Sequence, residues 1–443
     1  MKSALIVILQ LITFNSISQI SYNVELLDTW TDTARFKGAE DAIFSDIWGF
    51  TVNLNNYVAL GSTEGTHILE IVDDHLIERD FKTGRFSSSQ VQHRDYKTYK
   101  NYLYAVCDEG TSSLQIFDLS YLPDSIHTVY DNDIYFQICH NIFIDTNQAK
   151  LYACGTNNSG MTIFDISTPT QPQLFYDFND VNYVHDCYVT NDTAFLNCGI
   201  NGLYIYNFSS LPAMQLGLMD FYAEQGYNHS GWLSEDKKKY IFTDETKGKK
   251  VKICNSESLI DIEVEAIYGT KDYEDYVAHN VQIYSDFAFI SYYNEGLRIV
   301  DIMENKPNEI GFYDTFQTET NYKLNGAWGV YVFKNEELIL VSDRQNGLFL
   351  LHFPIQLYRN SQGQSKASST PFINDQSVII YPSKSTDNLY FSIYDSKGST
   401  IYKEEAIKDW ISIPLNIVSG IYIYSVSNLD FEIISKGKFT VIK

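Results

Sequence analysis

Apolar and polar residues alternate along this chain in short runs that recur with a long period. The stretch from Ala278 to Ile302, AHNVQIYSDFAFISYYNEGLRIVDI, is typical. Its apolar positions repeat every second residue, as in half-buried β-strands, and we find no long segment with the 3.6-residue period of an amphipathic helix. The 34 tyrosines and 27 phenylalanines also favour strands. The pattern therefore predicts an all-β protein.

The runs fall into units of 44 to 50 residues, each opened by a histidine or tryptophan. The opening residues are Trp48, His93, His140, His185, His229, His279 and Trp328. Each unit holds several short strands, and the third is the clearest, as in LQIFDLS, MTIFDIS and GLRIVDI. Four antiparallel strands in such a period form one blade of a β-propeller. The sequence thus predicts a seven-bladed β-propeller over residues 22–354.

The two ends of the predicted ring complement one another. The seventh unit stops at Pro354 without a fourth strand, while a strand-like segment, NVELLDTW, lies at Asn23 to Trp30 before the first unit. We expect this N-terminal strand to complete the seventh blade, because closure removes an exposed strand edge.

The flanking segments differ from the repeats. Residues 1–18 have the features of a secretory signal peptide: Lys2, an apolar run from Ala4 to Phe14 that is too short to span a bilayer, and small residues before Gln19. No other segment is predicted to cross a membrane. Residues 355–372 form a polar linker, and residues 373–443 have the strand pattern of a small C-terminal β-sandwich.

Charge and cysteine content narrow the function. With 56 acidic and 32 basic residues, the net charge of −24 argues against a nucleic-acid partner. The six cysteines include no CxxC pair, so a zinc-binding or disulfide scaffold is not predicted. Two interpretations stay open for them: buried small residues, or one or two local disulfides in an exported chain.

The recurring histidines are the candidate site. The inner strand of a propeller blade begins at the channel mouth, so we expect the histidines there together with Asp46. The returning second strands should add the pairs Asp108-Glu109, Asp244-Glu245 and Asp343-Arg344. The metal-ligand candidates are His93, His140, His185, His229, His279, Asp95 and Asp186. Imidazole is a suitable ligand for transition metals, and carboxylate for calcium or manganese. In the alternative, structural interpretation each histidine forms a hydrogen bond with the backbone of the neighbouring blade, and one such bond contributes about 1 kcal/mol to stability.

Other chemistry is sparse. The sequence has no GxSxG elbow, P-loop or HExxH motif. The aspartates that end the third strands, Asp118, Asp165 and Asp301, are predicted to form turns rather than calcium loops.

Three functions stay open. The favoured one is a surface-exposed binding or scaffold protein with a glycan or protein ligand. A metal-dependent hydrolase or lyase, with Asp186 or His185 as general base, and a structural adhesin are the alternatives.

The ring resembles the "choice-of-anchor B" family of LVIVD-repeat propellers over roughly residues 24 to 353. The matching segments are SDIWGF at Ser45, YVHDCYVTNDTAF at Tyr183, HSGWLSED at His229, SYYNEGLRIVDI at Ser291 and ILVSDRQNGLF at Ile339. The resemblance implies an exported surface propeller whose anchor varies between members. It implies no particular reaction.

The tail is similar to the type A C-terminal sorting domains of the type IX secretion system of the Bacteroidetes. The matching residues are Ile380-Tyr381-Pro382, Ile393-Tyr394-Asp395, Ser419-Gly420-Ile421-Tyr422 and Lys438-Phe439. Pro382-Ser383 stands where Asn-Pro is usual in that family. The resemblance implies export across both membranes of a Gram-negative bacterium by this machinery, with the tail usually removed.

Overall fold

The computed structural model describes residues 21–443 except 272–273, 304–305, 318–323, 335–336, 356–371, 374–376, 381–388, 396, 398, 407–410, 415–419, 428–432 and 442–443. The predicted signal peptide, residues 1–18, and most of the predicted linker, residues 355–372, lie outside the described residues. The chain divides into two compact units, Met1–Phe353 and Pro354–Lys443. Among the described residues, no helix is long and apolar enough to cross a membrane.

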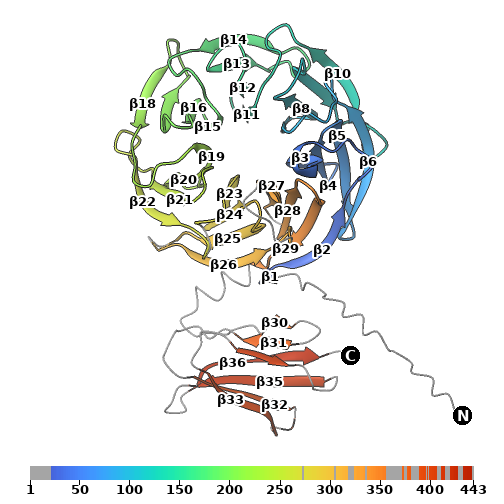
Figure 1. The fold of residues 1–443 in the computed structure, drawn as a ribbon, viewed down its shortest axis with the longest axis vertical. Helices are drawn as coiled ribbons and strands as arrows, with labels where there is room; N and C mark the ends of the chain where they lie inside the picture. Colours follow the sequence, from blue (N-terminus) through green and yellow to red (C-terminus); the bar gives the residue numbers. More distant parts are fainter. Residues whose placement is uncertain are drawn as a thin grey trace, which may run out of the picture. The chain divides into compact units, whose positions relative to one another are not determined.

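The first unit is a ring of seven antiparallel sheets, which are the blades of a β-propeller (Figure 1). Blade one comprises β3 (Phe44–Val52), β4 (Asn55–Ser62), β5 (Gly65–Val72) and β6 (His75–Thr83). Blade two comprises β7 (Arg94–Tyr99), β8 (Tyr102–Cys107), β9 (Leu114–Asp118) and β10 (His127–Asn132). Blade three comprises β11 (Asn141–Asp145), β12 (Lys150–Cys154), β13 (Met161–Asp165) and β14 (Gln173–Phe178). Blades four and five comprise β15 (Asp186–Thr190), β16 (Thr193–Asn197), β17 (Leu203–Asn207) and β18 (Met214–Met219); β19 (Asn228–Leu233), β20 (Lys239–Asp244), β21 (Val251–Asn255) and β22 (Glu263–Tyr268). Blades six and seven contain β23 (Val281–Tyr284), β24 (Phe287–Ser291), β25 (Leu297–Asp301) and β26 (Asn308–Tyr313); β27 (Ala327–Phe333), β28 (Leu338–Asp343) and β29 (Gly347–His352). A short 3-10 helix, η1 (Ala39–Asp41), precedes the first blade.

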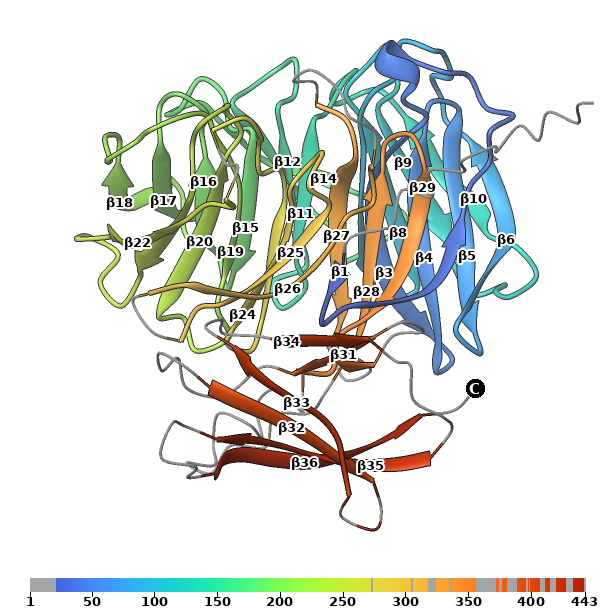
Figure 2. The same ribbon diagram turned by 60° about the horizontal axis from the view of Figure 1, so that its bottom comes forward.

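Within each blade the strand that comes first lies innermost and runs along the channel (Figures 1 and 2). The second and third strands have both faces covered by neighbouring blades, which explains their continuous apolar runs. One core cluster, for example, joins Ile163 and Phe178 of blade three to Leu196 and Tyr206 of blade four. The outer strands are more polar, because one face meets solvent.

The aspartates at the ends of the third strands form turns, as the sequence predicts. The Oδ1 atoms of Asp118, Asp165 and Asp301 each accept a hydrogen bond from the backbone N–H two residues further on, at 2.8 to 3.0 Å. This Asx geometry needs no bound ion.

The N-terminal segment contributes to two blades. β2 (Glu25–Trp30) pairs antiparallel with β29, with Glu25 opposite His352 and Trp30 opposite Leu348, and so forms the outer strand of blade seven. β1 (Ser21–Tyr22) pairs with β26 of blade six, which the sequence analysis did not anticipate because two residues carry no alternation pattern. Val24, between the two strands, is buried. The start of the ring is thereby hydrogen-bonded to its end.

The second unit consists of two antiparallel sheets. One contains β30 (Phe372–Ile373), β31 (Ser377–Ile380) and β34 (Ile411–Pro414); the other contains β32 (Leu389–Asp395), β33 (Thr400–Ala406), β35 (Gly420–Ser427) and β36 (Ile433–Val441). In the larger sheet Phe391, Ile393, Tyr422 and Tyr424 are buried, which gives it one apolar face. Two antiparallel sheets are consistent with the small β-sandwich expected from the sequence. Tyr381, Pro382 and Ser419, which belong to the sorting-domain resemblance, lie outside the described residues.

The pairing of β2 with β29 predicts that deletion of residues 22–31 destabilises the ring. Without β2, strand β29 would expose its free edge, and the buried contacts of Val24 and Trp30 would be lost. We expect aggregation, or a fall of roughly 10 °C or more in the unfolding midpoint measured by calorimetry. Thr29→Ala, on an exposed position of the same strand, is the control, and a deletion variant that melts like the wild type would refute closure by β2.

Candidate metal centre

Five histidines and one tryptophan form a closed ring of side chains at one end of the channel. The distances between neighbouring ring centroids are 4.2 Å for His93–His140, 4.1 Å for His140–His185, 4.4 Å for His185–His229, 4.4 Å for His229–His279, 4.2 Å for His279–Trp328 and 5.6 Å for Trp328–His93. Each residue lies at or just before the start of an inner strand, in blades two to seven. Local pairing fixes these positions, because the backbone N–H groups of His140, His185 and His279 donate to the second strand of their own blade at 2.8 to 3.0 Å.

Trp48 does not belong to this ring, although the sequence analysis placed it in the histidine series. It lies two residues beyond Asp46 in β3, further along the channel, where its indole N–H donates to Thr98 and its ring packs on Tyr331. Because Trp48 is aromatic, the sequence analysis treated it as equivalent to the histidines and to Trp328. The register of β3 with β4 instead places Ser45 at the equivalent position. Blade one therefore contributes no aromatic side chain to the ring, and Trp328 reaches His93 directly.

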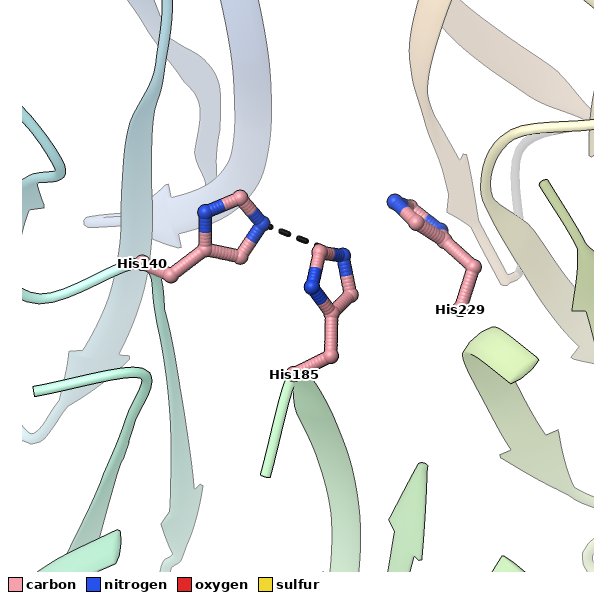
Figure 3. A group of neighbouring side chains, drawn as sticks. All are labelled: His140, His185 and His229. Carbon is pink, nitrogen blue, oxygen red and sulfur yellow. Dashed lines mark hydrogen bonds between the residues drawn. The ribbon is translucent and has the colours of Figure 1, made fainter. Parts of the chain in front are cut away.

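Three of the histidines bring nitrogen donors together. One donor atom each from His140, His185 and His229 lies within 4.8 Å of the other two, and the Nε2 atoms of His140 and His185 are 3.1 Å apart (Figure 3). Ligands of a tetrahedral zinc ion, each about 2.0–2.1 Å from the metal, are separated by about 3.4 Å. The three rings face a common space in Figure 3, so small side-chain movements would complete a three-nitrogen site.

A second group of donors shares His229. Donor atoms of His229, Glu245 and His279 also lie within 4.8 Å of one another, and His229 Nε2 is 3.6 Å from a Glu245 carboxylate oxygen. Since a neutral imidazole offers one lone pair, His229 can ligate in only one of the two groups at a time. The ring thus offers two adjacent positions for one ion.

Hydrogen bonds at Nδ1 orient the imidazoles. The Nδ1–H group of His140 donates to Asp108 Oδ2 at 2.8 Å, that of His229 to the backbone carbonyl of His279 at 3.0 Å, and that of His279 to the carbonyl of Trp328 at 2.7 Å. Each of these bonds puts the hydrogen of the neutral ring on Nδ1 and the lone pair on Nε2; in His140 that lone pair faces His185 Nε2. Metal-binding histidines characteristically use the second nitrogen in this way, which fixes the tautomer and the ring orientation.

Two tyrosines orient His185. The hydroxyl groups of Tyr183 and Tyr227 lie 3.3 and 3.2 Å from its Nδ1. In neutral His140, whose Nδ1–H donates to Asp108, Nε2 carries no hydrogen, so the Nε2–H group of His185 donates to it and His185 Nδ1 accepts from a tyrosine. The sequence analysis missed both tyrosines, although the pattern Tyr-x-His occurs at residues 183–185 and again at 227–229.

Burial keeps most of the ring neutral. Desolvation lowers the pKa of His93, His185, His229 and His279, with neighbouring histidines adding to the effect. Burial also acts to lower the pKa of His140, but the hydrogen bond and charge of Asp108 raise it overall. A neutral imidazole is the form that binds a metal ion.

His93 is the unsatisfied member of the ring. It is 5 % exposed and stacks on His140 with an interplanar angle of 8°, and neither of its ring nitrogens has a hydrogen-bond partner among the described residues. A buried polar group without a partner is costly, by about 1–3 kcal/mol. This marks the histidine end of the channel as a place where a further polar species would be stabilised.

Asp95 and Asp186, which the sequence grouped with the histidines, lie apart from the donor groups. Asp186 and Asp46 line a cavity of about 40 Å³ together with Lys97, Asn141 and Ser230, whereas no histidine lines it. Asp95 follows His93 by two residues, and Asp186 follows His185 by one. The aspartates therefore lie further along the inner strands than the histidines and form a second layer in the channel. The expected single cluster of histidine and aspartate is therefore two layers.

Lys97 is the counter-ion of the second layer. Its ammonium group donates to both carboxylate oxygens of the fully buried Asp95 at 2.9 and 3.2 Å. Asp186 accepts from the Cys187 backbone N–H at 2.6 Å, and burial, opposed by the charge of Lys97, raises its pKa to about 6. Burial and the charge of Asp95 raise the pKa of Asp46.

The second-strand pairs divide between the ring and the blade interior. Asp108 and Glu245 reach the histidines, and Glu109 lies 3.4 Å from the His93 backbone nitrogen, as expected. Asp244 and Asp343 do not: Asp244 accepts from Lys252 and Tyr222 between blades, and Asp343 accepts from Thr315. Asp244 and Asp343 are the last residues of β20 and β28, where successive side chains point to opposite faces, whereas Asp108 and Glu109 both follow the end of β8 and are not bound by this alternation. Arg344 is held over the Trp328 ring, at 4.9 Å.

Comparisons with known proteins support the fold and the repeat. The LVIVD repeat family matches residues 152–180 and 277–315. The β-propeller domain of Cps50 (Swd1) from Myceliophteria thermophila has a similar structure, with 10% sequence identity and a TM-score of 0.52, covering 74% of this chain and 99% of that one. The computationally designed protein Ika8 aligns with 11% identity and a TM-score of 0.45, covering 78% and 95%. The comparison with curated proteins gives no match. This chain thus contains a β-propeller with LVIVD repeats.

Loss of the Asp108 carboxylate should weaken metal binding without removing a ligand. Asp108→Ala frees His140 to rotate and removes the acceptor of its Nδ1–H group, so we expect a 10- to 100-fold increase in the Kd for Zn²⁺, measured by isothermal titration calorimetry. Asp124→Ala, at an exposed loop position, is the control. Equal affinities for the two variants would show that Asp108 does not hold His140 for metal binding.

Proposed function

We propose that this protein is an exported binding protein whose propeller holds a divalent transition-metal ion at the histidine end of the channel. The observation that carries the proposal is the convergence of donor atoms from His140, His185 and His229, drawn from three different blades. A packing role alone would not require these atoms to face one another.

The donor set favours a transition metal over calcium. Three imidazole nitrogens suit Zn²⁺, Cu²⁺ or Ni²⁺, whereas Ca²⁺ and Mg²⁺ take oxygen ligands. With three protein ligands, such an ion keeps an open coordination position. An oxygen or nitrogen donor from a surface glycan or a protein partner would bind there, which connects the metal with the binding role.

The structural interpretation of the histidines is compatible with this proposal. His229 and His279 do bond backbone carbonyls of the following blade through Nδ1. These bonds use only one nitrogen of each ring, so the same residues brace the blades and present Nε2 to the ion.

A metal-dependent hydrolase or lyase is supported less well. The bases put forward from the sequence are Asp186 and His185. Asp186 is engaged with the Cys187 backbone in the second layer, and His185 is itself a proposed ligand. Asp186 lies apart from the donor groups, and His185 would use its lone pair on the metal ion, so neither is placed to take a proton from a metal-bound water.

Export and surface location rest on the sequence of the two ends. The signal-peptide pattern in residues 1–18 and the likeness of residues 373–443 to a type IX sorting domain support a route across both membranes, with the type IX machinery as partner. An exported propeller would acquire its metal ion outside the cytoplasm.

Removing two ring histidines should abolish metal binding. In His185→Ala/His279→Ala, each of the two donor groups loses a member, so we expect metal content by plasma mass spectrometry to fall from about one ion per chain to near zero. His75→Ala, whose side chain is 70% exposed, is the matched control. If wild type and double variant both lack metal after incubation with Zn²⁺, Cu²⁺ and Ni²⁺ in turn, the proposed site is wrong.

Export predicts a shortened mature chain. We expect the form recovered from the cell surface or medium to begin near Gln19 and to lack most of residues 373–443, as measured by intact-mass spectrometry. A surface form that retains the tail would count against a type IX sorting domain. An unprocessed chain found only in the cytoplasm would contradict export.

A further inference from the structure

Two cysteines of neighbouring blades lie in contact in the core. The Sγ atoms of Cys154, at the end of β12, and Cys187, in β15, are 3.4 Å apart. Both side chains are buried in the core cluster that joins blades three and four. We propose that Cys154 and Cys187 form an inter-blade disulfide in the exported protein.

The geometry singles out this pair from the six cysteines, all of which are buried thiols in the structure. A disulfide needs the sulfurs at about 2.05 Å, so the pair must approach by only about 1.4 Å. Cys139 lies nearby, but its Sγ is directed at the backbone oxygens of Asn141 and Cys154, both at 3.3 Å. Among the described residues, no group of three potential metal ligands includes a cysteine, which favours a disulfide over a thiolate metal site.

The bond would connect β12, which pairs with the strand that follows His140, to β15, which follows His185. Cys154 lies opposite Asn141, the residue after His140, and Cys187 follows His185 by two residues. The disulfide would therefore hold blades three and four at the spacing that brings His140 Nε2 to His185 Nε2. It would also close a loop of about 33 residues, which constrains the unfolded chain.

The chemistry requires an oxidant and an exposed thiol. A disulfide of an extracytoplasmic thiol oxidoreductase, or oxidised glutathione in vitro, is attacked by one cysteine thiolate to give a mixed disulfide. The thiolate of the second cysteine then attacks the mixed disulfide, forms the Cys154–Cys187 bond and displaces the oxidoreductase or glutathione as a thiolate. The two cysteines lose two electrons and two protons in total, and the oxidant is reduced to thiols. Because burial raises the pKa of the Cys154 thiol, exchange would take place during folding, before the blades close. Formation of the disulfide in the cell rests on the proposed export of the protein. Its formation in vitro does not.

The test is oxidative refolding of the full chain. The reduced, denatured protein is refolded in a glutathione redox buffer, denatured again, and its free thiols are alkylated and counted by mass spectrometry. We expect four of the six cysteines to react. Residues 151–236 contain no Lys or Arg, so trypsin leaves both cysteines in one peptide, whereas cleavage at Asp165, Asp177 and Asp180 separates them and identifies the link.

Variants relate the bond to stability. We expect addition of a reducing agent to lower the Tm of the oxidised wild type by about 5 °C. The Tm of Cys154→Ser and of Cys187→Ser should not change on reduction. Cys254→Ser, a buried cysteine in blade five, is the matched control and should retain the shift. Six reactive thiols after oxidative refolding, or a link between other cysteines, would overturn the proposal. A correct bond in vitro together with a fully reduced pair in protein isolated from cells would instead contradict export.

Discussion

Closure of the ring is the constraint on which the rest of this structure depends. The side chains that meet at the axis come from blades two to seven, between His93 and Trp328, and each blade alone presents a single member. Neighbouring members contact one another through the packing of adjacent blades, and the pairing of β2 with β29 returns the chain to its starting point, so that the ring closes. The last contact, from Trp328 to His93, spans blade one, where no aromatic side chain faces the ring. Closure therefore determines both stability and the composition of the site.

The axis is polar in a molecule whose blades are otherwise packed through apolar and aromatic side chains. Beside the histidine ring lies a second layer in which Asp95 and Lys97 form a buried ion pair and Asp46 and Asp186 have raised pKa values. Buried charges of this kind contribute little to stability compared with apolar residues of similar volume. The unpartnered His93 adds a further cost. We interpret this unfavourable polarity as the consequence of a binding site, since packing alone gives no reason for it.

The repeat explains the scaffold but not the activity. In blades two to six the third strand, such as Leu297–Asp301, supplies the blade core and ends in an Asp or Asn, whereas in blades one and seven it ends in Val72 and His352. The side chains that differ from blade to blade stand at the start of the inner strands, where Ser45, His93 and Trp328 occupy comparable places. A propeller hosts many unrelated functions, so function has to be argued from these positions and from their partners Asp108, Tyr183 and Tyr227.

The sequence by itself determined the architecture, because alternation with a period of two and a repeat of 44 to 50 residues leave few ways to bury the apolar faces. It also identified the histidines, since a residue recurring at the start of the inner strands must lie near the axis. Only the tertiary structure decided which donors converge. Asp186 is the next residue after His185, yet it lies in the second layer of the channel. Glu245 reaches His229, whereas the preceding residue, Asp244, accepts from Lys252 on another face of the blade. The contact of Tyr227 with His185, the displacement of Trp48 and the contact between Cys154 and Cys187 depend on packing between blades. Such contacts join residues far apart in the chain, and no local pattern of hydrophobic and polar positions encodes them.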